Sequence, residues 1–129
     1  MFLRIDAHNG LAVYDQISRQ VKFAIADGTL TSGEMVPSVR ELARELTINP
    51  NTVARAYRQL QQDQVLEPVR GTGLVVSSGA RKSCQAERVR LIRARMHDVL
   101  VEANHSGLDT KKIEELFHTE LKSLQRKTR

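Results

Sequence analysis

Two polar side chains lie where a helix is expected to begin, in the stretch NPNTVARAY of residues 49–57. Asn51 and Thr52 follow an Asn-Pro pair directly. An asparagine amide matches the hydrogen-bonding edge of adenine, and a threonine can bond a phosphate or touch a thymine methyl group. These residue types therefore suit contact with a nucleic acid, provided that the fold presents them on one exposed surface.

Arginines extend this candidate surface along the same expected helix. At 100° per residue, Asn51, Arg55 and Arg58 lie opposite the apolar stripe that contains Val53 and Leu60. A guanidinium group can bond guanine or a phosphate. The backbone N–H groups of the first helical turn are expected to add a phosphate site. The alternative is a polar helix face that only meets water.

Two earlier helices are expected to support this surface. A helical period predicts the first helix from residue 13 to residue 25, with Gly28 as its terminator. Ser38 and Glu41 have the spacing of a capping box, so a second helix is expected to begin there. It should end near Thr47, because a proline follows. The link GTLTSGEMVP between the two helices is expected to be a turn-rich loop.

The third helix and a hairpin complete the pattern. Asn49 is a natural N-cap and Pro50 suits the first helical position, which predicts a recognition helix over residues 50–63. The short β-prone runs VLEPV and LVVS, separated by RGTG, then predict a hairpin, the wing, over residues 65–77. Pro68 implies an edge position or a strand end. A helix-turn-helix followed by such a hairpin is a winged helix-turn-helix.

Further candidate contacts come from the second helix and from the hairpin tip. Arg40 and Arg44 lie on the exposed side of the second helix, where the alternative is pairing with neighbouring glutamates. Arg70, beside the tip glycines, is placed for a minor groove, since narrow A·T tracts attract cations. The complete set of expected DNA contacts is Arg40, Arg44, Asn49, Asn51, Thr52, Arg55, Arg58, Arg70, Gly71 and Thr72.

The last third of the chain predicts a helical tail. SSGARKS, residues 77–83, is expected to be a polar linker, and a long amphipathic helix follows until Gly107 breaks it. Asp109 can cap a last helix. Two such helices cannot bury their apolar stripes alone, so they need each other, the winged domain or a second subunit. The expected dimerisation residues are Val89, Ile92, Met96, Val99, Ile113, Phe117, Leu121 and Leu124.

The charge distribution fits an anionic partner without deciding the matter. Net charge is +5, and most of the excess lies in the last third of the chain. Arginines flank the apolar stripe of the long helix, where a helical dimer places its interacting charges. We therefore expect Arg93 to pair with Glu120 across a dimer interface, the alternative being a solvated helix face. Arg81 and Lys82 are expected to be able to add phosphate contacts.

Other classes of function find little support in the sequence. The single cysteine, Cys84, excludes an internal disulfide and is expected to be an unpaired linker thiol. His97, His105 and His118 lack the close spacing of metal ligands. Neither a phosphate-cradling glycine loop nor a nucleophile elbow occurs. We therefore expect no catalysis, no cofactor and no metal, in a cytoplasmic protein without a signal peptide or membrane span.

The motifs resemble a known family. PSVRELARELTINPNTVARAYRQL followed by RGTGLVV is similar to the winged-helix domain of GntR-family bacterial transcriptional regulators. The leader FLRIDAHNGLAVYDQI, the Asn-Pro-Asn-Thr-Val start and the short two-helix tail resemble the YtrA subfamily. The resemblance implies a homodimer on a pseudo-palindromic operator, most often acting as a repressor. It also implies DNA contacts by Arg40, Asn51, Thr52 and Arg70-Gly71.

Four positions depart from the family pattern. Ala12 replaces the usual proline of the leader, and Gln64 stands where a glycine usually ends the recognition helix. Leu74 replaces the usual phenylalanine after the wing glycines, which should weaken packing of the wing. Ala54 stands where many branches have a DNA-contacting arginine, so Arg55 or Arg58 is expected to take over part of that role.

The sequence thus predicts a mainly α protein with a small β-hairpin. Residues 1–78, with a leader over residues 1–11, are expected to form a winged helix-turn-helix DNA-binding domain. Residues 79–129 are expected to form a linker and a two-helix tail for dimerisation or effector binding. Expected partners are operator DNA, a second copy and an unknown small-molecule effector. The alternative is a winged-helix adaptor that binds protein and uses the tail to oligomerise.

Overall fold

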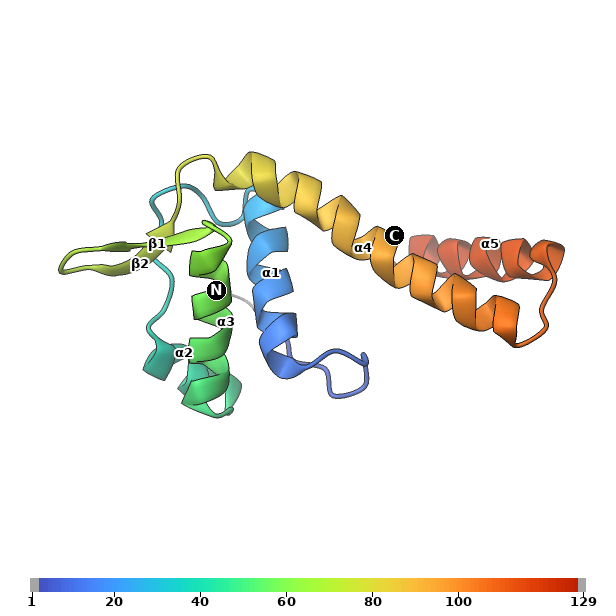
Figure 1. Ribbon diagram of the computed structural model, residues 1–129, viewed down its shortest axis with the longest axis horizontal. Helices are drawn as coiled ribbons and strands as arrows, with labels where there is room; N and C mark the ends of the chain where they lie inside the picture. Colours follow the sequence, from blue (N-terminus) through green and yellow to red (C-terminus); the bar gives the residue numbers. More distant parts are fainter. Residues whose placement is uncertain (1–2, 128–129) are drawn as a thin grey trace. The chain divides into compact units, whose positions relative to one another are not determined.

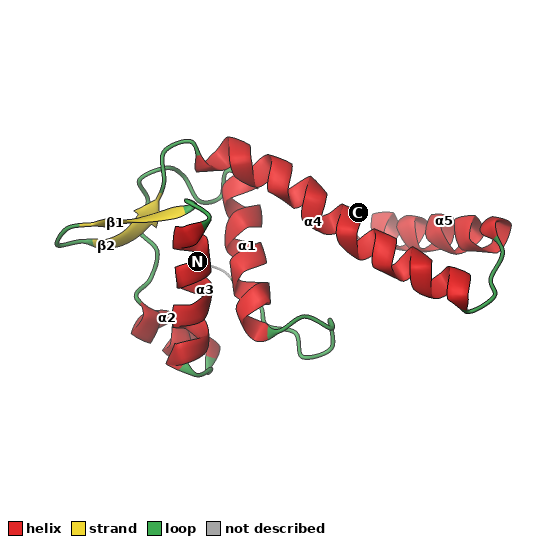
Figure 2. Cartoon of the chain, viewed as in Figure 1, coloured by secondary structure: helices red, strands yellow, loops and turns green. Residues whose placement is uncertain are grey.

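A computed structural model describes residues 3–127, so the parts of the predicted leader and tail at residues 1–2 and 128–129 lie outside the described residues. Helices dominate, with one hairpin among them, as predicted (Figure 1 and Figure 2). The elements are α1 (Val13–Asp27), α2 (Val39–Leu46), α3 (Pro50–Gln62), β1 (Leu66–Val69), β2 (Gly73–Val76), α4 (Ala80–His105) and α5 (Thr110–Lys127). Contacts divide the chain into two compact units, Met1–Val89 and Arg90–Arg129.

The core of the first unit is aliphatic, because α1, α2 and α3 each turn an apolar stripe inward. Within residues 3–127, the aromatic ring buried in this core belongs to Tyr57, whose hydroxyl donates to the carbonyl oxygen of Pro37 at 2.7 Å. Burial, with smaller contributions from two glutamates, raises the pKa of Tyr57, so the phenol keeps the proton that it donates. The side chains with the lowest exposure are those of Ile17, Val21, Leu42, Val53, Ala56 and Leu60.

The link between α1 and α2 is more ordered than predicted. Met35 forms an isolated antiparallel bridge with Val75. On either side of it, the Val36 amide donates to the carbonyl of Leu74 at 3.0 Å, and the Val76 amide donates to the carbonyl of Glu34 at 2.9 Å. The expected turn-rich loop therefore pairs with the free side of β2. Sequence reasoning missed this pairing because the segment is too short to show a strand period.

The hairpin has the predicted position and an edge proline. β1 and β2 are antiparallel, with Leu66 opposite Val76 and Pro68 opposite Leu74. β1 pairs with β2 alone, so Pro68 lies on an edge strand as expected, where its missing N–H group breaks no ladder bond. Leu74 is half-buried and packs against the core, which keeps the base of the wing attached to the helices.

The expected linker is wrong from Ala80 onward, because Ala80–Ser83 form the first turn of α4. Ala80 and Cys84 are 2% and 1% exposed and belong to the core of the first unit. Cys84 is therefore a packed thiol, and its burial raises its pKa. The Gln85 amide also donates to the carbonyl oxygen of Ala26 at the end of α1, at 3.2 Å. The domain boundary after residue 78 stays a prediction.

A buried lysine ties three helices of the first unit together. Lys22 of α1 is 7% exposed, and its Nζ lies 2.9 Å from Asp63 Oδ2 and 3.6 Å from Glu87 Oε1. Asp63 follows the last residue of α3 and also accepts a hydrogen bond from Gln59 at 3.1 Å. The ammonium is thus paired with carboxylates from the end of α3 and from α4, as a charge at this depth requires.

The second unit contains the rest of α4 and all of α5. Gly107, at φ 92°, ends the turn after α4, and the Asp109 side chain caps α5 by accepting from the Lys112 amide at 2.9 Å. Both features were predicted. The apolar stripes of the two helices remain exposed in the single chain, at Ile92, Met96, Val99, Leu116, Phe117, Leu121 and Leu124.

Replacing Asp63 with asparagine tests the buried lysine cluster. Asp63→Asn keeps the shape but removes the closer negative charge, which leaves Glu87, at 3.6 Å, as the carboxylate beside the buried ammonium. We expect a loss of about 2 kcal/mol in the free energy of unfolding. Urea denaturation followed by circular dichroism measures it. The control is Glu67→Gln on the exposed strand β1, which should change stability by less than about 0.5 kcal/mol. Equal effects of both substitutions would contradict a structural role for the cluster.

Candidate nucleic-acid interface

The turn between α2 and α3 is closed by backbone hydrogen bonds. The Ile48 amide donates to Ala43 O at 3.0 Å, and the Thr47 amide donates to Arg44 O at 3.3 Å, which is a Schellman arrangement. Thr47 takes a left-handed conformation, with φ 54°. Because this residue reverses the chain, only three residues separate the end of α2 from the start of α3.

The starts of both helices are capped as the sequence predicts. Ser38 accepts from the Glu41 amide, and the Glu41 carboxylate accepts from the Ser38 amide, both at 3.1 Å. These hydrogen bonds, the one from the Ser38 backbone first, lower the pKa of Glu41. At α3, the Asn49 side chain accepts from the Asn51 amide at 2.8 Å. Asn49 thus serves as the N-cap, and its expected DNA contact stays a prediction.

Helix α3 already uses the first of its backbone N–H groups within the chain. Its backbone N–H groups were expected to offer a phosphate site. The Asn51 amide already donates to the Asn49 side chain, and the Thr52 amide donates to the Asn49 carbonyl at 3.0 Å. Pro50 has no N–H group to donate. The phosphate site expected at this helix end stays a prediction, and Asn51 and Thr52 would have to give up these hydrogen bonds to supply their N–H groups.

The first turn of α3 presents two polar side chains beside a completely buried one. Val53 has no exposed surface, whereas Asn51 is exposed and Thr52 half-exposed. Within residues 3–127, no hydrogen bond of the Asn51 side-chain amide is recorded, so that amide is available to a ligand. The structure therefore brings these two predicted contacts together at one exposed helix end.

The arginines of α3 differ in their surroundings. Arg58 is exposed. The Arg55 guanidinium lies over the aromatic ring of Tyr14, with Cζ 3.7 Å from the ring centroid. The sequence patterns did not predict this contact with Tyr14. The available signal was its type, since a half-buried tyrosine in the first turn of a helix offers a ring face to a neighbouring cation.

Arg40 and Arg44 are both exposed on α2, the helix next to α3. The alternative for Arg40 was a local pair with Glu41 or Glu45. The carboxylate of Glu41 is instead held by the Ser38 amide in the capping box. Neither arginine makes an ion pair recorded within residues 3–127. Both guanidinium groups are therefore available to an anionic partner.

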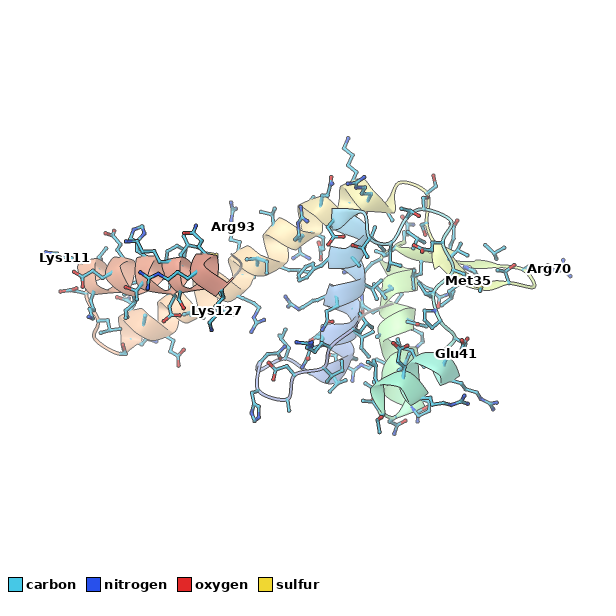
Figure 3. The ribbon with its side chains drawn as sticks, turned by 180° about the vertical axis from the view of Figure 1, so that it is seen from behind. Met35, Glu41, Arg70, Arg93, Lys111 and Lys127 are labelled. Carbon is cyan, nitrogen blue, oxygen red and sulfur yellow. The ribbon has the colours of Figure 1, made fainter. Side chains whose placement is uncertain are left out.

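The tip of the hairpin carries Arg70 away from the helices, as Figure 3 shows. The Thr72 amide donates to the carbonyl of Val69 at 2.9 Å, which closes a tight turn. Gly71, at φ 78°, is the residue that makes this turn, because a side chain there would strain the backbone. Arg70, Gly71 and Thr72 are all exposed, as expected for a wing tip.

Three further observations bear on other kinds of site. Within residues 3–127, His, Cys, Asp and Glu side chains form no group of three or more that could hold a metal ion. In the same range, every helix is too short or too polar to cross a bilayer. An open groove of about 590 Å³ lies in the first unit, beside the end of α3, β1 and the start of α4. It has mixed hydroxyl, amide and carboxylate lining.

These features define the chain as a winged helix-turn-helix protein of the class that binds DNA. Residues 13–76 match the protein family described as "Bacterial regulatory proteins, gntR family". The repressor YtrA of Bacillus subtilis (strain 168) is 31% identical over 113 residues, which cover 88% of this chain and 87% of that protein. The chain belongs to the GntR family of bacterial regulatory proteins. It is a DNA-binding transcriptional regulator and not an enzyme.

Solved structures agree with this assignment. A GntR-family transcriptional regulator from Listeria monocytogenes is 28% identical, with a TM-score of 0.68, and the match covers 89% of this chain and 98% of that one. YtrA from Sulfolobus acidocaldarius, a GntR-family transcription factor, is 33% identical with a TM-score of 0.58, covering 74% and 99% respectively. The predicted fold class and the predicted family are both confirmed.

Replacing Thr47 with glycine tests the turn between α2 and α3. Thr47 has a β-branched side chain in a left-handed conformation, which costs a non-glycine residue about 1 kcal/mol. Thr47→Gly should therefore raise the free energy of unfolding by about 1 kcal/mol, measured by urea denaturation. Thr47→Ala keeps a Cβ atom and should bring no comparable gain. A lower stability of the glycine variant would contradict the left-handed turn.

Proposed function

We propose that this chain is a dimeric repressor that binds a pseudo-palindromic operator. Helix 50–63 lies in the major groove and the wing, residues 65–77, lies at the minor groove. The observation that carries the proposal is the first turn of α3, where Asn51 and Thr52 are presented beside the completely buried Val53. A helix-turn-helix reads base edges from this end of its second helix. The repressor name of the B. subtilis relative supports the direction of regulation.

Each candidate side chain has a role that suits its chemistry. The amide of Asn51 reads a base, since it can bond adenine at two points, and Thr52 bonds a phosphate or touches a thymine methyl. Arg40 and Arg44, exposed on α2, hold the backbone at the edge of the groove. Arg70 enters the minor groove, where its charge is attracted to narrow A·T tracts.

Exposed apolar side chains on the tail support the dimer. Val89, Val99 and Leu124 are 58%, 62% and 59% exposed, which is costly for a single chain in water. In the second unit, α4 and α5 flank an apolar hollow of about 340 Å³ lined in part by Met96 and Phe117. A second copy that offers the same stripes would cover these surfaces by symmetry. Of the predicted dimerisation residues, Ile113 is half-buried and the others are exposed.

The remaining assignments belong to the same proposal. Residues 1–78 bind DNA, and residues 79–129 dimerise and are the part open to an effector. A regulator that acts on bacterial chromosomal DNA works in the cytoplasm, and we place this chain there.

The primary experiment identifies the operator and then measures specificity. The full chain is used to select bound duplexes from a random DNA pool. Binding to the selected duplex and to a scrambled one is then measured across a salt series. A specific reader keeps its preference for the selected duplex as salt rises, while binding to the scrambled duplex fades. Enrichment of no sequence would refute the proposal and favour the protein-binding adaptor.

Alanine substitutions separate base reading from backbone binding. Asn51→Ala removes an amide proposed to bond a base, so it should relax the preference at particular base pairs. We expect discrimination there to fall by about 1 to 3 kcal/mol. Arg70→Ala should instead weaken binding to all selected sequences by a similar factor. Selection with each variant measures the difference, and equal losses on every sequence for Asn51→Ala would exclude base reading by that residue.

Charge reversal tests the proposed pair across the dimer interface. Arg93 and Glu120 are both exposed and lie on the tail helices, where Figure 3 shows Arg93 on α4. Arg93→Glu or Glu120→Arg alone should weaken the dimer, because each places like charges together. The double reversal should restore it, as measured by analytical ultracentrifugation. If the double variant stays monomeric, these two residues do not pair.

A further inference from the structure

The contact between Arg55 and Tyr14 joins the recognition helix to the first helix. Arg55 is exposed in the second turn of α3, and Tyr14 is half-buried in the first turn of α1. The guanidinium carbon lies 3.7 Å from the ring centroid, which is the distance of a stacked cation–π pair. The ring therefore restrains the plane of the guanidinium and holds it over the seam between α1 and α3.

Hydrogen bonds from the leader hold the first two turns of α1, the helix whose first turn carries Tyr14. The Gln16 amide donates to the carbonyls of Asp6 and Leu11 at 2.8 and 3.0 Å, and its oxygen accepts from the Asp6 amide at 2.8 Å. One turn later, Gln20 makes the same paired bonds with the backbone of Arg4, at 2.8 and 2.7 Å. The first turn of a helix tends to fray, and these side-chain amides prevent it here.

The charge of Arg55 is left without a carboxylate. Among residues 3–127, the guanidinium of Arg55 contacts the Tyr14 ring and makes no ion pair. A neutral ring restrains the group without cancelling its charge. Stacking occupies the face of the guanidinium and leaves the in-plane N–H donors at its edge free for an anion.

The position of Arg55 favours a phosphate over a base. It lies four residues after Asn51, or about 6 Å further along the helix axis from the end that reads bases. An arginine that reads guanine must extend both in-plane donors to the floor of the groove. The ring of Tyr14 instead keeps this one at the edge of α3 that faces α1. At such an edge a helix in the major groove passes the backbone of the duplex.

We propose that Arg55 binds a phosphodiester of the operator backbone and does not read a base, and that Tyr14 is the positioning residue that orients it. This inference rests on the proposed function, because it assigns a separate task to one residue of the same DNA-binding surface. Base discrimination then falls to the first turn of α3, while the seam between α1 and α3 adds affinity on any sequence.

The test measures affinity and its salt dependence on the duplex selected from the random pool and on a scrambled duplex. Arg55→Ala should weaken both about tenfold and reduce the slope of log affinity against log salt by about one unit. The base preference should not change. The control is Arg126→Ala, which removes one positive charge from an exposed position on α5 and should leave the slope unaltered.

Substitutions at Tyr14 test its positioning role. Tyr14→Phe keeps the ring and should bind as the original chain does. Tyr14→Leu removes it and should weaken both duplexes about threefold, in line with a cation–π contact at an exposed site. Once Arg55 is alanine, Tyr14→Leu should cause no further loss, because Tyr14 acts through Arg55. A merely structural role would give additive losses in this double-mutant cycle.

Three results would overturn the inference. The first is a changed base preference in Arg55→Ala, which would make Arg55 a base reader. The second is an unchanged salt slope in that variant. The third is additive losses from Tyr14→Leu and Arg55→Ala.

If Tyr14→Leu fails to fold, the variant Arg55→Lys tests the inference instead. A flexible ammonium should keep the salt slope and lose part of the affinity, and a full loss of slope would contradict phosphate binding. The unsubstituted chain separates the two proposals, since its failure to prefer the selected duplex refutes the function itself.

Discussion

Burial of one apolar stripe of α3 controls the geometry of the surface proposed to bind DNA. Val53, Ala56 and Leu60 have no exposed surface, so the helix cannot rotate about its axis without exposing them. A helix held in this way must present its opposite face to solvent. Asn51 and Arg58 occupy that face, and the same burial that stabilises the core therefore turns them toward solvent.

Polar interactions add what apolar packing cannot supply, which is a definite start and end for each helix. The capping box of Ser38 and the N-cap of Asn49 begin α2 and α3, and the left-handed residues Thr47 and Gln64 follow them. Gln64 takes the conformation that a glycine usually supplies, with φ 61°, and the Val65 amide still closes the turn at 2.8 Å to Leu60 O. The departure from the family pattern at Gln64 thus leaves the cap intact.

Charged side chains have a structural role in the core and are available to a partner on the surface. Lys22 is buried and paired, and it holds the end of α3 and the start of α4 against α1. Arg40, Arg44 and Arg70 are exposed and make no recorded ion pair within residues 3–127, which suits an anionic partner. Net charge alone would point to the tail, where most of the basic excess lies. The surface proposed to read DNA is instead defined by the placement of a few side chains.

The sequence alone determined the helices, their caps, the hairpin and the family, because these depend on local periods, capping spacings and turn residues. Contacts between residues that are far apart in the sequence could not be predicted in this way. Three contacts join segments that are far apart in sequence. Met35 pairs with Val75, and the Tyr14 ring lies beneath Arg55. Cys84, in a segment expected to be a linker, is buried in the core of the first unit. Tertiary structure decided these contacts, because which segments meet depends on how all the buried stripes pack together.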